Sequence, residues 1–220
     1  METKVIAHIR SALSGKFGAP RQSGLVEELK AEIHFTPGFR KSEALRGLEG
    51  FDYVWLLWEF SQNRIPDVDD FRATVRPPRL GGNTRMGVFA TRSPYRPNAI
   101  GLSCVRLEKV DFDRCILLVR GADLVDGTPI LDIKPYISYT DAHSEARCGF
   151  TDDTGWKPLK VIIPEERKND FTREEAEALE KLLSLDPRPR YQDDRERVYG
   201  LTFSGREVKF RVEADTLTVI

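Results

Sequence analysis

The sequence predicts a mainly β protein in which short strands form one antiparallel sheet, curled into a barrel or a sandwich. Three observations support this fold class. Apolar and polar residues alternate in many short runs, Pro, Gly and Asp-Gly separate these runs, and almost no helical pattern lies between them before residue 160. Parallel strands need long, usually helical connections, so antiparallel pairing is expected.

The first part of the chain contributes strands separated by loops. Residues 4–10 and 30–35 alternate in strand fashion, and a loop at 11–24 lies between them. Residues 40–46 are expected to form a short helical turn. Residues 51–60, FDYVWLLWEF, are dense in aromatic and aliphatic side chains, which favours a central strand, with a buried helix as the alternative.

Further short strands are expected up to residue 136, and the composition then changes. The predicted strands are residues 71–75, 87–90, 100–110, 115–120 and 130–136. The stretch 140–160 is polar and contains Gly and Pro, as in an exposed loop. We therefore divide the chain into a barrel domain at 1–160 and a small domain at 161–220.

The C-terminal domain is predicted to combine one helix with a small sheet, an α+β arrangement. The helix lies within residues 171–185, because Thr172 and Glu175 have capping-box spacing and Pro187 follows. Its apolar face is expected to contain Ala176, Leu179, Leu182 and Leu183. The predicted strands are residues 161–163, 198–203, 207–212 and 217–220. A chain ending near Lys160 should therefore still fold.

The composition is that of an ordinary soluble protein. The chain has 220 residues, a formal net charge of -1, 40% hydrophobic residues and 31% charged residues. It contains no apolar run that approaches membrane-spanning length and no secretory signal at its start, so a cytoplasmic location is expected. No metal site is expected, because the cysteines and histidines form no ligand-spaced cluster: Cys104, Cys115, Cys148, His8, His34 and His143. Cys104 and Cys115 are expected to be small buried side chains.

Residues 71–107, which we call the arginine-rich segment, carry charge of one sign. They include seven arginines but no lysine, aspartate or glutamate, although the whole chain has 35 acidic residues. Arginine suits planar, bidentate or stacked anionic partners, so the segment is a candidate anion-binding surface. The alternative is a solvated strand face, or arginines that pair with acids elsewhere, and charge alone does not separate these interpretations.

Several common motifs are absent. No GxGxxG follows a predicted strand, which excludes the usual Rossmann dinucleotide site. Gly82 and Gly87 have the spacing of a phosphate-binding loop, but Val88 and Phe89 stand where that loop requires Lys and Ser or Thr. Residues 101–105 begin like the turn of a serine hydrolase but lack its closing glycine.

Two stretches remain as candidate sites. Residues 91–101, TRSPYRPNAIG, contain two prolines that exclude a strand interior, together with side chains able to make directed polar contacts. Residues 122–136, ADLVDGTPILDIKPY, contain a tight turn at Asp126-Gly127. The alternative is that both stretches merely join strands and that their charged residues pair with one another: Arg92, Arg96, Asp123 and Asp126.

Long strings of this sequence resemble the TsaA-like, or TrmO, family of S-adenosylmethionine-dependent tRNA methyltransferases. They are PRQSG (20–24), RGLEGFDYVWLL (46–57), TVRPPRLGGNTRMGVFATRSPYRPNAIGLS (74–103), DLVDGTPILDIKPY (123–136) and DPRPRY (186–191). The resemblance implies an antiparallel single-sheet β-barrel outside the Rossmann plan, a C-terminal accessory domain and a homodimer. The domain at 161–220 is expected to contact tRNA, so a chain ending near Lys160 should still bind the cofactor but lose affinity for tRNA. It also implies methylation of the exocyclic amine of N6-threonylcarbamoyladenosine at tRNA position 37, in the anticodon stem-loop.

The resemblance also assigns cofactor contacts. They fall on Pro20, Arg21, Gln22, Ser61, Gln62, Arg92, Leu102, Leu124, Val125, Asp126 and Gly127. The sequence departs from the family pattern at two positions. Ser61 stands where the family has histidine before Gln62, which weakens that assignment, and Ala99 replaces the proline of RPNPIG. Leu102 and Val125 would contact the cofactor through their backbone.

The residues also allow an expectation about mechanism. Methyl transfer depends mainly on positioning and on exclusion of water, so the absence of an obvious acid-base pair is acceptable. Arg21 or Arg92 is expected to bind a carboxylate of the cofactor or the substrate. Candidates for a catalytic role are Asp126, Tyr95 and Asn98, and candidates for binding tRNA phosphates are Arg72, Arg76, Arg79, Arg85 and Arg96. The alternative function is a noncatalytic RNA-binding barrel without a cofactor pocket.

Overall fold

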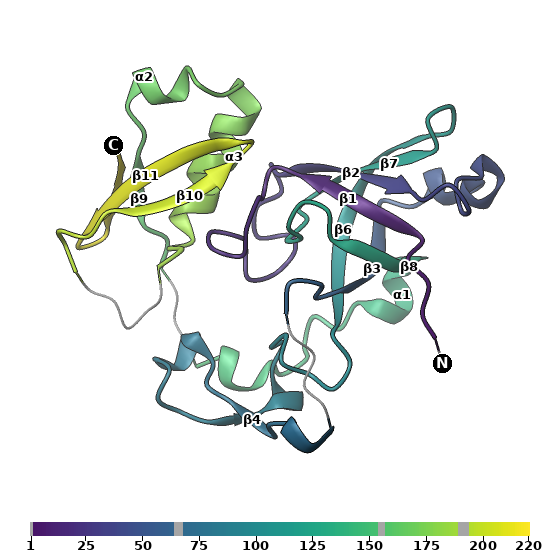
Figure 1. Cartoon of the computed structure of the whole chain (residues 1–220), viewed down its shortest axis with the longest axis horizontal. Coiled ribbons are helices and arrows are strands. Elements are labelled where there is room, and N and C mark those ends of the chain that lie inside the picture. Colours follow the sequence, from purple (N-terminus) through teal and green to yellow (C-terminus); the bar gives the residue numbers. More distant parts are fainter. Residues whose placement is uncertain (1, 64–67, 154–156, 189–193) are drawn as a thin grey trace.

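A computed structural model of the chain describes residues 2–63, 68–153, 157–188 and 194–220 (Figure 1). Tyr191, at the end of the DPRPRY string, lies outside the described residues, and so do the side chains of Val68 and Arg79. The described chain forms a barrel, a loop segment beside the barrel and a C-terminal module of sheet and helices.

Six antiparallel strands close into a barrel, as predicted. Their order around the barrel is β1-β2-β7-β6-β3-β8, so the last strand pairs with the first. The strands are β1 (Ala7–Ser11), β2 (Lys30–Phe35), β3 (Tyr53–Glu59), β6 (Ile100–Asp111), β7 (Ile116–Arg120) and β8 (Pro129–Pro135). Closure leaves the sheet without free edges, and the short connections suit antiparallel neighbours.

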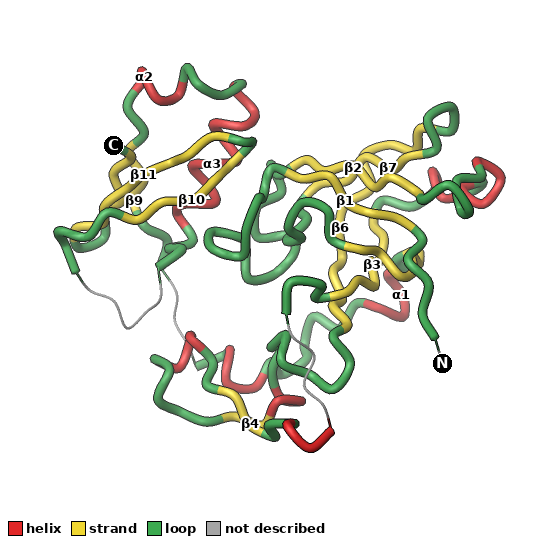
Figure 2. Tube along the Cα trace, viewed as in Figure 1, coloured by secondary structure: helices red, strands yellow, loops and turns green. Residues whose placement is uncertain are grey.

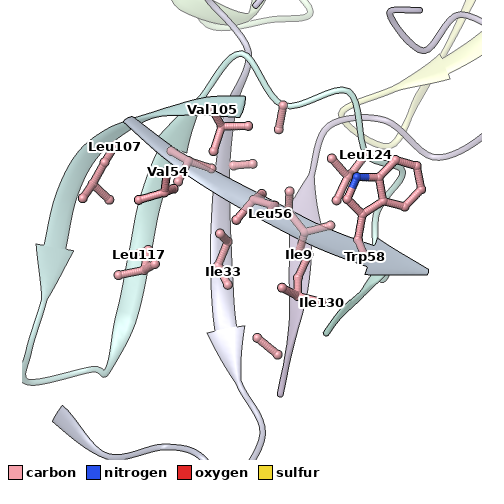
Figure 3. Packing of buried hydrophobic residues seen from close by; sticks show 14 of the residues in the cluster. Ile9, Ile33, Val54, Leu56, Trp58, Val105, Leu107, Leu117, Leu124 and Ile130 are labelled. Carbon is pink, nitrogen blue, oxygen red and sulfur yellow. The ribbon is translucent and has the colours of Figure 1, made fainter. Parts of the chain in front are cut away.

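The barrel interior is a continuous apolar core. Along β3, Val54, Leu56 and Trp58 face inward and are at most 9% exposed, whereas Tyr53 on the outer face is 38% exposed. This period of two is that of a strand, so the alternative of a buried helix is wrong. Figure 3 shows Val54 and Leu56 packed with Leu117 and other side chains of the cluster.

The cysteine prediction is half correct. Cys115 is buried in the barrel core, at the turn between β6 and β7. Cys104 is only partly buried, because the alternation along β6 places it on the outer face, opposite Trp55 of β3. The neighbouring Ser103 faces inward instead.

The arginine-rich segment contains much less strand than predicted. Residues 100–107 belong to β6 in the barrel wall, as predicted. Between residues 71 and 99, the strands are the two-residue β4 (Thr74–Val75) and β5 (Met86–Gly87), which pair with each other, and the end of the predicted strand at 87–90 is the 3-10 turn η5 (Val88–Ala90). Pro77 and Pro78 have no backbone N–H to offer a partner strand, which limits β4. Most of the segment therefore lies outside the barrel wall, below the barrel in Figure 1.

The C-terminal module is an α+β unit, as predicted. Its sheet has the order β10-β11-β12-β9, in which only β12 and β9 are parallel. The strands are β9 (Lys160–Ile162), β10 (Tyr199–Phe203), β11 (Arg206–Glu213) and β12 (Thr216–Val219), and the helices are α2 (Glu165–Lys168) and α3 (Arg173–Ser184). The predicted capping box of Thr172 and Glu175 is present. The buried face of α3 contains Ala178 rather than Ala176, because the stripe centres on Leu179 and Leu182.

Short helical turns complete the described chain. They are η1 (Ser42–Leu45), η2 (Leu48–Gly50), η3 (Val68–Asp70), η4 (Pro78–Leu80), α1 (Ser138–Asp141) and η6 (Gly149–Thr151). The predicted helical turn at 40–46 corresponds to η1, and the predicted loop at 140–160 contains the end of α1 and all of η6.

A second apolar core lies in the C-terminal module, but it is not built from that module alone. It includes Leu13, Val26 and Leu29 from the connection between β1 and β2, residues 12–29, which we call the β1–β2 loop. Leu13 also forms an isolated antiparallel bridge with Phe203 of β10. Figure 2 shows this loop extending from β1 toward β10 and α3. The second core therefore crosses the predicted boundary near residue 160.

Candidate active site

The predicted cofactor segments come together at one end of the barrel. The chain leaves the barrel there at Ser11, Glu59 and Arg120, and the strands that re-enter begin at Lys30, Ile100 and Pro129. The connections at this end are the β1–β2 loop, residues 60–99 and residues 121–128. Antiparallel order alone thus gathers three segments that are far apart in the sequence.

Direct contacts join these three connections. Lys16 Nζ donates a hydrogen bond to the carbonyl oxygen of Gln62 at 2.6 Å. The Arg92 guanidinium donates to the side-chain oxygen of Gln22. The Asp126 backbone N–H donates to the carbonyl oxygen of Leu13 at 2.7 Å. Each connection is therefore held by at least one of the others.

The Asp-Gly turn presents a carboxylate at this end of the barrel. Gly127 has a φ of 77°, which suits glycine, and Thr128 N–H closes the turn on the Val125 oxygen at 3.1 Å. The Asp126 carboxylate accepts from the backbone N–H of Ser11 at 3.0 Å and lies 3.4 Å from Arg10 Nη1. The alternative in which Asp126 pairs with Arg92 or Arg96 is therefore wrong.

Asp123 lies on the connection between β7 and β8, and the sequence predicted for it only a possible ion pair with an arginine. The structure gives it further partners. Trp58 Nε1 donates to Ser103 Oγ at 3.0 Å, and Ser103 Oγ donates to Asp123 Oδ1 at 2.6 Å. The backbone of Ser23 in the β1–β2 loop also donates to this carboxylate. Burial raises the pKa of Asp123, while these hydrogen bonds and the charge of Arg92 partly oppose the rise.

Arg92 and Arg96 have different surroundings. Arg96 Nη1 donates to the carbonyl oxygens of Thr91 at 2.7 Å and Val88 at 3.2 Å, and its guanidinium lies 5.6 Å from the centre of the Phe89 ring. These contacts brace its own loop. The Arg92 side chain is exposed, and its described hydrogen bond goes to the neutral amide of Gln22, so its charge remains available to an anion.

The other predicted catalytic candidates lie on the same connection as Arg92. Tyr95 is 58% exposed, and Asn98 is also exposed. Neither side chain forms a hydrogen bond to another residue that the structure describes here, although the Asn98 carbonyl accepts from Ile100 N–H at 2.8 Å. Both side chains are thus accessible to a bound substrate, without a fixed orientation.

The remaining predicted cofactor contacts differ in their exposure. Arg21, Ser61, Gln62 and Gly127 are exposed, and Gln22 and Val125 are half-buried. Pro20 and Leu124 are buried, and Leu124 belongs to the barrel core. Leu102 points to the outer face of β6 and is 54% exposed. The side chain of Leu124 thus packs inside the barrel, and that of Leu102 lies on the outer face of the barrel wall.

The predicted phosphate-binding arginines lie on the segment outside the barrel. Arg72, Arg76 and Arg85 are exposed, while the side chain of Arg79 is outside the description. Phe89 on the same segment is 71% exposed and its ring lies 6.2 Å from that of Phe71. Cations and an exposed aromatic ring are the groups that suit a single-stranded or looped RNA.

No group of three or more His, Cys, Asp or Glu residues in the described ranges is arranged to hold a metal ion. Among the helices that the structure describes, none has the length and apolar character required to cross a membrane.

Comparison with known proteins places the chain in a family. The tRNA-methyltransferase O N-terminal domain matches residues 8–142, and the TrmO C-terminal domain matches residues 157–220. The tRNA (adenine(37)-N6)-methyltransferase of Escherichia coli K12 is 39% identical over 217 residues, which cover 94% of this chain and 91% of that protein. A protein of Pseudomonas aeruginosa PAO1, named as a putative S-adenosylmethionine-dependent methyltransferase RcsF, is 44% identical over 193 residues, 85% of this chain and 81% of its own length.

The solved structures agree with the sequence matches. The crystal structure of TrmO from Pseudomonas aeruginosa superimposes with a TM-score of 0.79 at 33% identity, and the match covers all of this chain and 97% of the other. Both domains are thus matched in sequence, and the whole chain is matched in structure. The chain belongs to the tRNA-methyltransferase O family.

Proposed function

We propose that this protein methylates the N6 nitrogen of N6-threonylcarbamoyladenosine at position 37 of tRNA. The broader activity, that of an S-adenosylmethionine-dependent tRNA (adenine37-N6)-methyltransferase, is the activity of its family. The alternative of a noncatalytic RNA-binding barrel is therefore set aside. The observation that carries the finer assignment is Arg92, an exposed guanidinium that bonds to a neutral amide near Asp123.

The side chains at this end of the barrel fit the cofactor. S-adenosylmethionine presents a carboxylate, an ammonium group, ribose hydroxyls and an adenine ring. The site offers the guanidinium groups of Arg21 and Arg92, the amide of Gln22 and the carboxylate of Asp126. These donors and acceptors match the polar groups of the cofactor in kind. We assign the cofactor to the surface formed by Pro20–Gln22, Arg92 and residues 124–127.

The chemistry needs little more than positioning. When bound, S-adenosylmethionine would supply an electrophilic methyl group: the bond from sulfur to methyl breaks, the bond from N6 to methyl forms, and the products are S-adenosylhomocysteine, the methylated base and the proton that leaves N6. The β1–β2 loop, residues 60–99 and residues 121–128 are joined by hydrogen bonds, which support a fixed arrangement of the candidate site residues. A fixed arrangement favours alignment of the reacting groups. The proton leaves a nitrogen that is gaining a bond to carbon, so a weak base is sufficient. Asp126 is the proposed acceptor, with Tyr95 and Asn98 as the other candidates.

Recognition of the threonylcarbamoyl group is assigned to arginine. The modification adds a carboxylate to the base, and a guanidinium binds a carboxylate through two parallel hydrogen bonds. Arg92 suits this role because its guanidinium is exposed and its described hydrogen bond goes to the neutral amide of Gln22, with Asp123 near enough to interact with its charge. Arg21 is then assigned to the carboxylate of the cofactor.

The remaining partners are also part of this proposal. Arg72, Arg76, Arg79, Arg85 and Arg96 are proposed to contact phosphates of the anticodon stem-loop.

A homodimer is proposed through the outer face of β6, where Ile100 and Leu102 are 42% and 54% exposed. The protein is proposed to act in the cytoplasm. Light scattering of the purified protein tests the dimer.

The test of the reaction uses labelled S-adenosylmethionine and one tRNA in two forms. The form that carries threonylcarbamoyladenosine should be labelled at position 37, and the unmodified transcript of the same sequence should receive little or no label. Nuclease digestion and mass spectrometry identify the methylated nucleoside. Equal labelling of the two forms would show that the threonylcarbamoyl group is not recognised. Cofactor binding without transfer to either form would contradict the reaction itself.

A further inference from the structure

The β1–β2 loop contacts both the proposed cofactor site and the C-terminal module. On one side, Gln22 bonds to Arg92 and Ser23 bonds to Asp123. On the other side, Leu13 and Val26 are buried in the second core, at 3% and 1% exposure. A single loop thus links the site to a sheet that contributes none of the predicted cofactor residues.

Phe17 is the most conspicuous contact between this loop and the C-terminal sheet. Its ring stacks on Tyr199 and on Phe210, with centroids 6.5 Å apart in both cases and interplanar angles of 12° and 9°. The next residue, Gly18, has a φ of 89°, and a Cβ atom there would lie 2.7 Å from Leu201 Cδ2. The loop backbone therefore rests directly on the face of β10.

Leu13 joins the C-terminal sheet to the Asp-Gly turn. It bridges to Phe203, and the carbonyl of the preceding Ala12 accepts from Ser204 N–H at 2.9 Å. The carbonyl of Leu13 itself accepts from Asp126 N–H at 2.7 Å. A displacement of β10 would thus be transmitted to both the start of the loop and the turn that carries Asp126.

We propose that the C-terminal module positions the β1–β2 loop for cofactor binding, with Phe17 and Leu13 as positioning residues. The proposal rests on the cofactor site assigned above and is separate from any contact of the module with RNA. A long loop containing Gly15, Gly18 and Gly24 loses much conformational entropy when it is ordered around a ligand. Packing on β10 orders the loop before the cofactor arrives, which raises affinity.

This proposal revises the expectation that the barrel is independent. A chain ending near Lys160 would expose Leu13, Val26 and Leu29 to water and would leave Phe17 without its aromatic partners. The β1–β2 loop would then lack the packing partners that the C-terminal module provides. The full chain is accordingly the right material for the test.

The test replaces Phe17 by alanine in the full chain. Phe17 is 39% exposed, so the change should leave the protein folded. Phe17→Ala should raise the Kd for S-adenosylmethionine in calorimetry, and its KM, by roughly tenfold, with kcat at saturating cofactor within about twofold. Phe112→Ala is the matched control, because Phe112 is also 39% exposed but follows β6 at the other end of the barrel.

Two further variants sharpen the result. Phe17→Tyr keeps the stacked ring and should restore the affinity of the original protein, whereas Gly18→Ala should weaken cofactor binding by pushing the loop off Leu201. The inference is overturned if Phe17→Ala binds the cofactor as tightly as Phe112→Ala. It is also overturned if kcat falls while KM stays constant, because that pattern indicates a loss of folded protein. An original protein that binds no cofactor would instead contradict the proposed function, and the inference with it.

Discussion

The two ends of the barrel differ in how their charged groups are used. The end opposite the candidate site has an open hollow, lined by Ile6, Phe35, Phe39, Ala44, Leu45, Arg46, Gly47, Leu48, Phe51, Asp132, Ile133 and Pro135. Its charged residues are already paired, Arg46 with Glu43 at 2.6 Å and Asp132 with Lys134 at 2.9 Å. At the site end, Arg92 bonds to a neutral amide. The hollow offers apolar area, whereas the site end offers an exposed guanidinium whose described hydrogen bond goes to a neutral amide, and such a group can align a charged ligand for methyl transfer.

The largest expected effect on activity comes from removing the guanidinium of Arg92. Arg92→Ala should lower kcat/KM on modified tRNA by roughly 100-fold or more, because a charged hydrogen-bond donor to the substrate or cofactor is lost. The melting temperature should change by only a few degrees, since the side chain is exposed. Arg46→Ala at the opposite end is the matched control and should keep activity. If Arg92→Ala and Arg46→Ala lose activity equally, the two ends of the barrel do not differ in their role in the reaction.

The next effect concerns the half-buried Asp123. Asp123→Ala leaves the hydroxyl of Ser103 and the N–H of Ser23 without their acceptor, which should lower the free energy of unfolding by about 1–3 kcal/mol in urea titrations. Asp123→Asn keeps an acceptor oxygen and should cost less. If both variants are as stable as the original protein, the hydrogen-bond chain does not support the site.

The same residue gives a pH prediction. Because the pKa of Asp123 is raised in the folded protein, the folded state holds this proton more tightly than the unfolded chain. Its contribution to stability is thus fully present below the ordinary aspartate pKa and is lost as the pH rises through the raised pKa. The stability of the original protein relative to Asp123→Asn should therefore decrease as pH increases across that window. Urea titrations of both proteins at several pH values measure this difference, and a constant difference would contradict it.

A smaller effect is expected on the arginine-rich segment. Arg72→Ala and Arg85→Ala should each weaken tRNA binding and reduce the slope of log affinity against log salt by about 1, without changing cofactor affinity. Arg114→Ala is a suitable control, because Arg114 lies outside this segment and is 3.4 Å from Glu32. Filter binding over a salt series gives the slopes. If Arg72→Ala and Arg85→Ala give the same salt slope as Arg114→Ala, the arginine-rich segment does not contact the RNA phosphates.

The smallest effect is expected at the hollow. Phe39 is 40% exposed there, so Phe39→Ala should leave kcat/KM for both substrates within about twofold. Steady-state assays with modified tRNA give the comparison with Arg92→Ala. A large loss of activity in Phe39→Ala would mean that the hollow takes part in the reaction.

Local patterns in the sequence predicted most of the fold. Residues 30–35 form β2 with the predicted ends, and the capping box correctly located the start of α3. Alternation could not distinguish a barrel from a sandwich, because closure depends on which strands meet, and only the family resemblance favoured a barrel. The strands predicted at 71–75 and 87–90 were too long, since apolar composition does not reveal a missing partner strand.

The candidate site was predictable in its segments but not in its contacts. Motif strings located the three connections, and antiparallel topology explains why they meet. The role of Asp123 could not be read from its neighbours in sequence, because Trp58, Ser103 and Ser23 lie on other elements. The second core, which combines the β1–β2 loop with the C-terminal module, could not be predicted for the same reason. Nothing near Leu13 in the sequence indicates that its partner is Phe203.

The bridge between Leu13 and Phe203 also has a consequence for how the protein matures. It joins residues near opposite ends of the chain, and such distant contacts form late because a long loop must close first. During synthesis the barrel strands emerge well before β10, so they can pair while the β1–β2 loop still lacks its support. If the C-terminal module positions this loop as proposed, a nascent chain gains its full affinity for the methyl donor only after β10 has emerged.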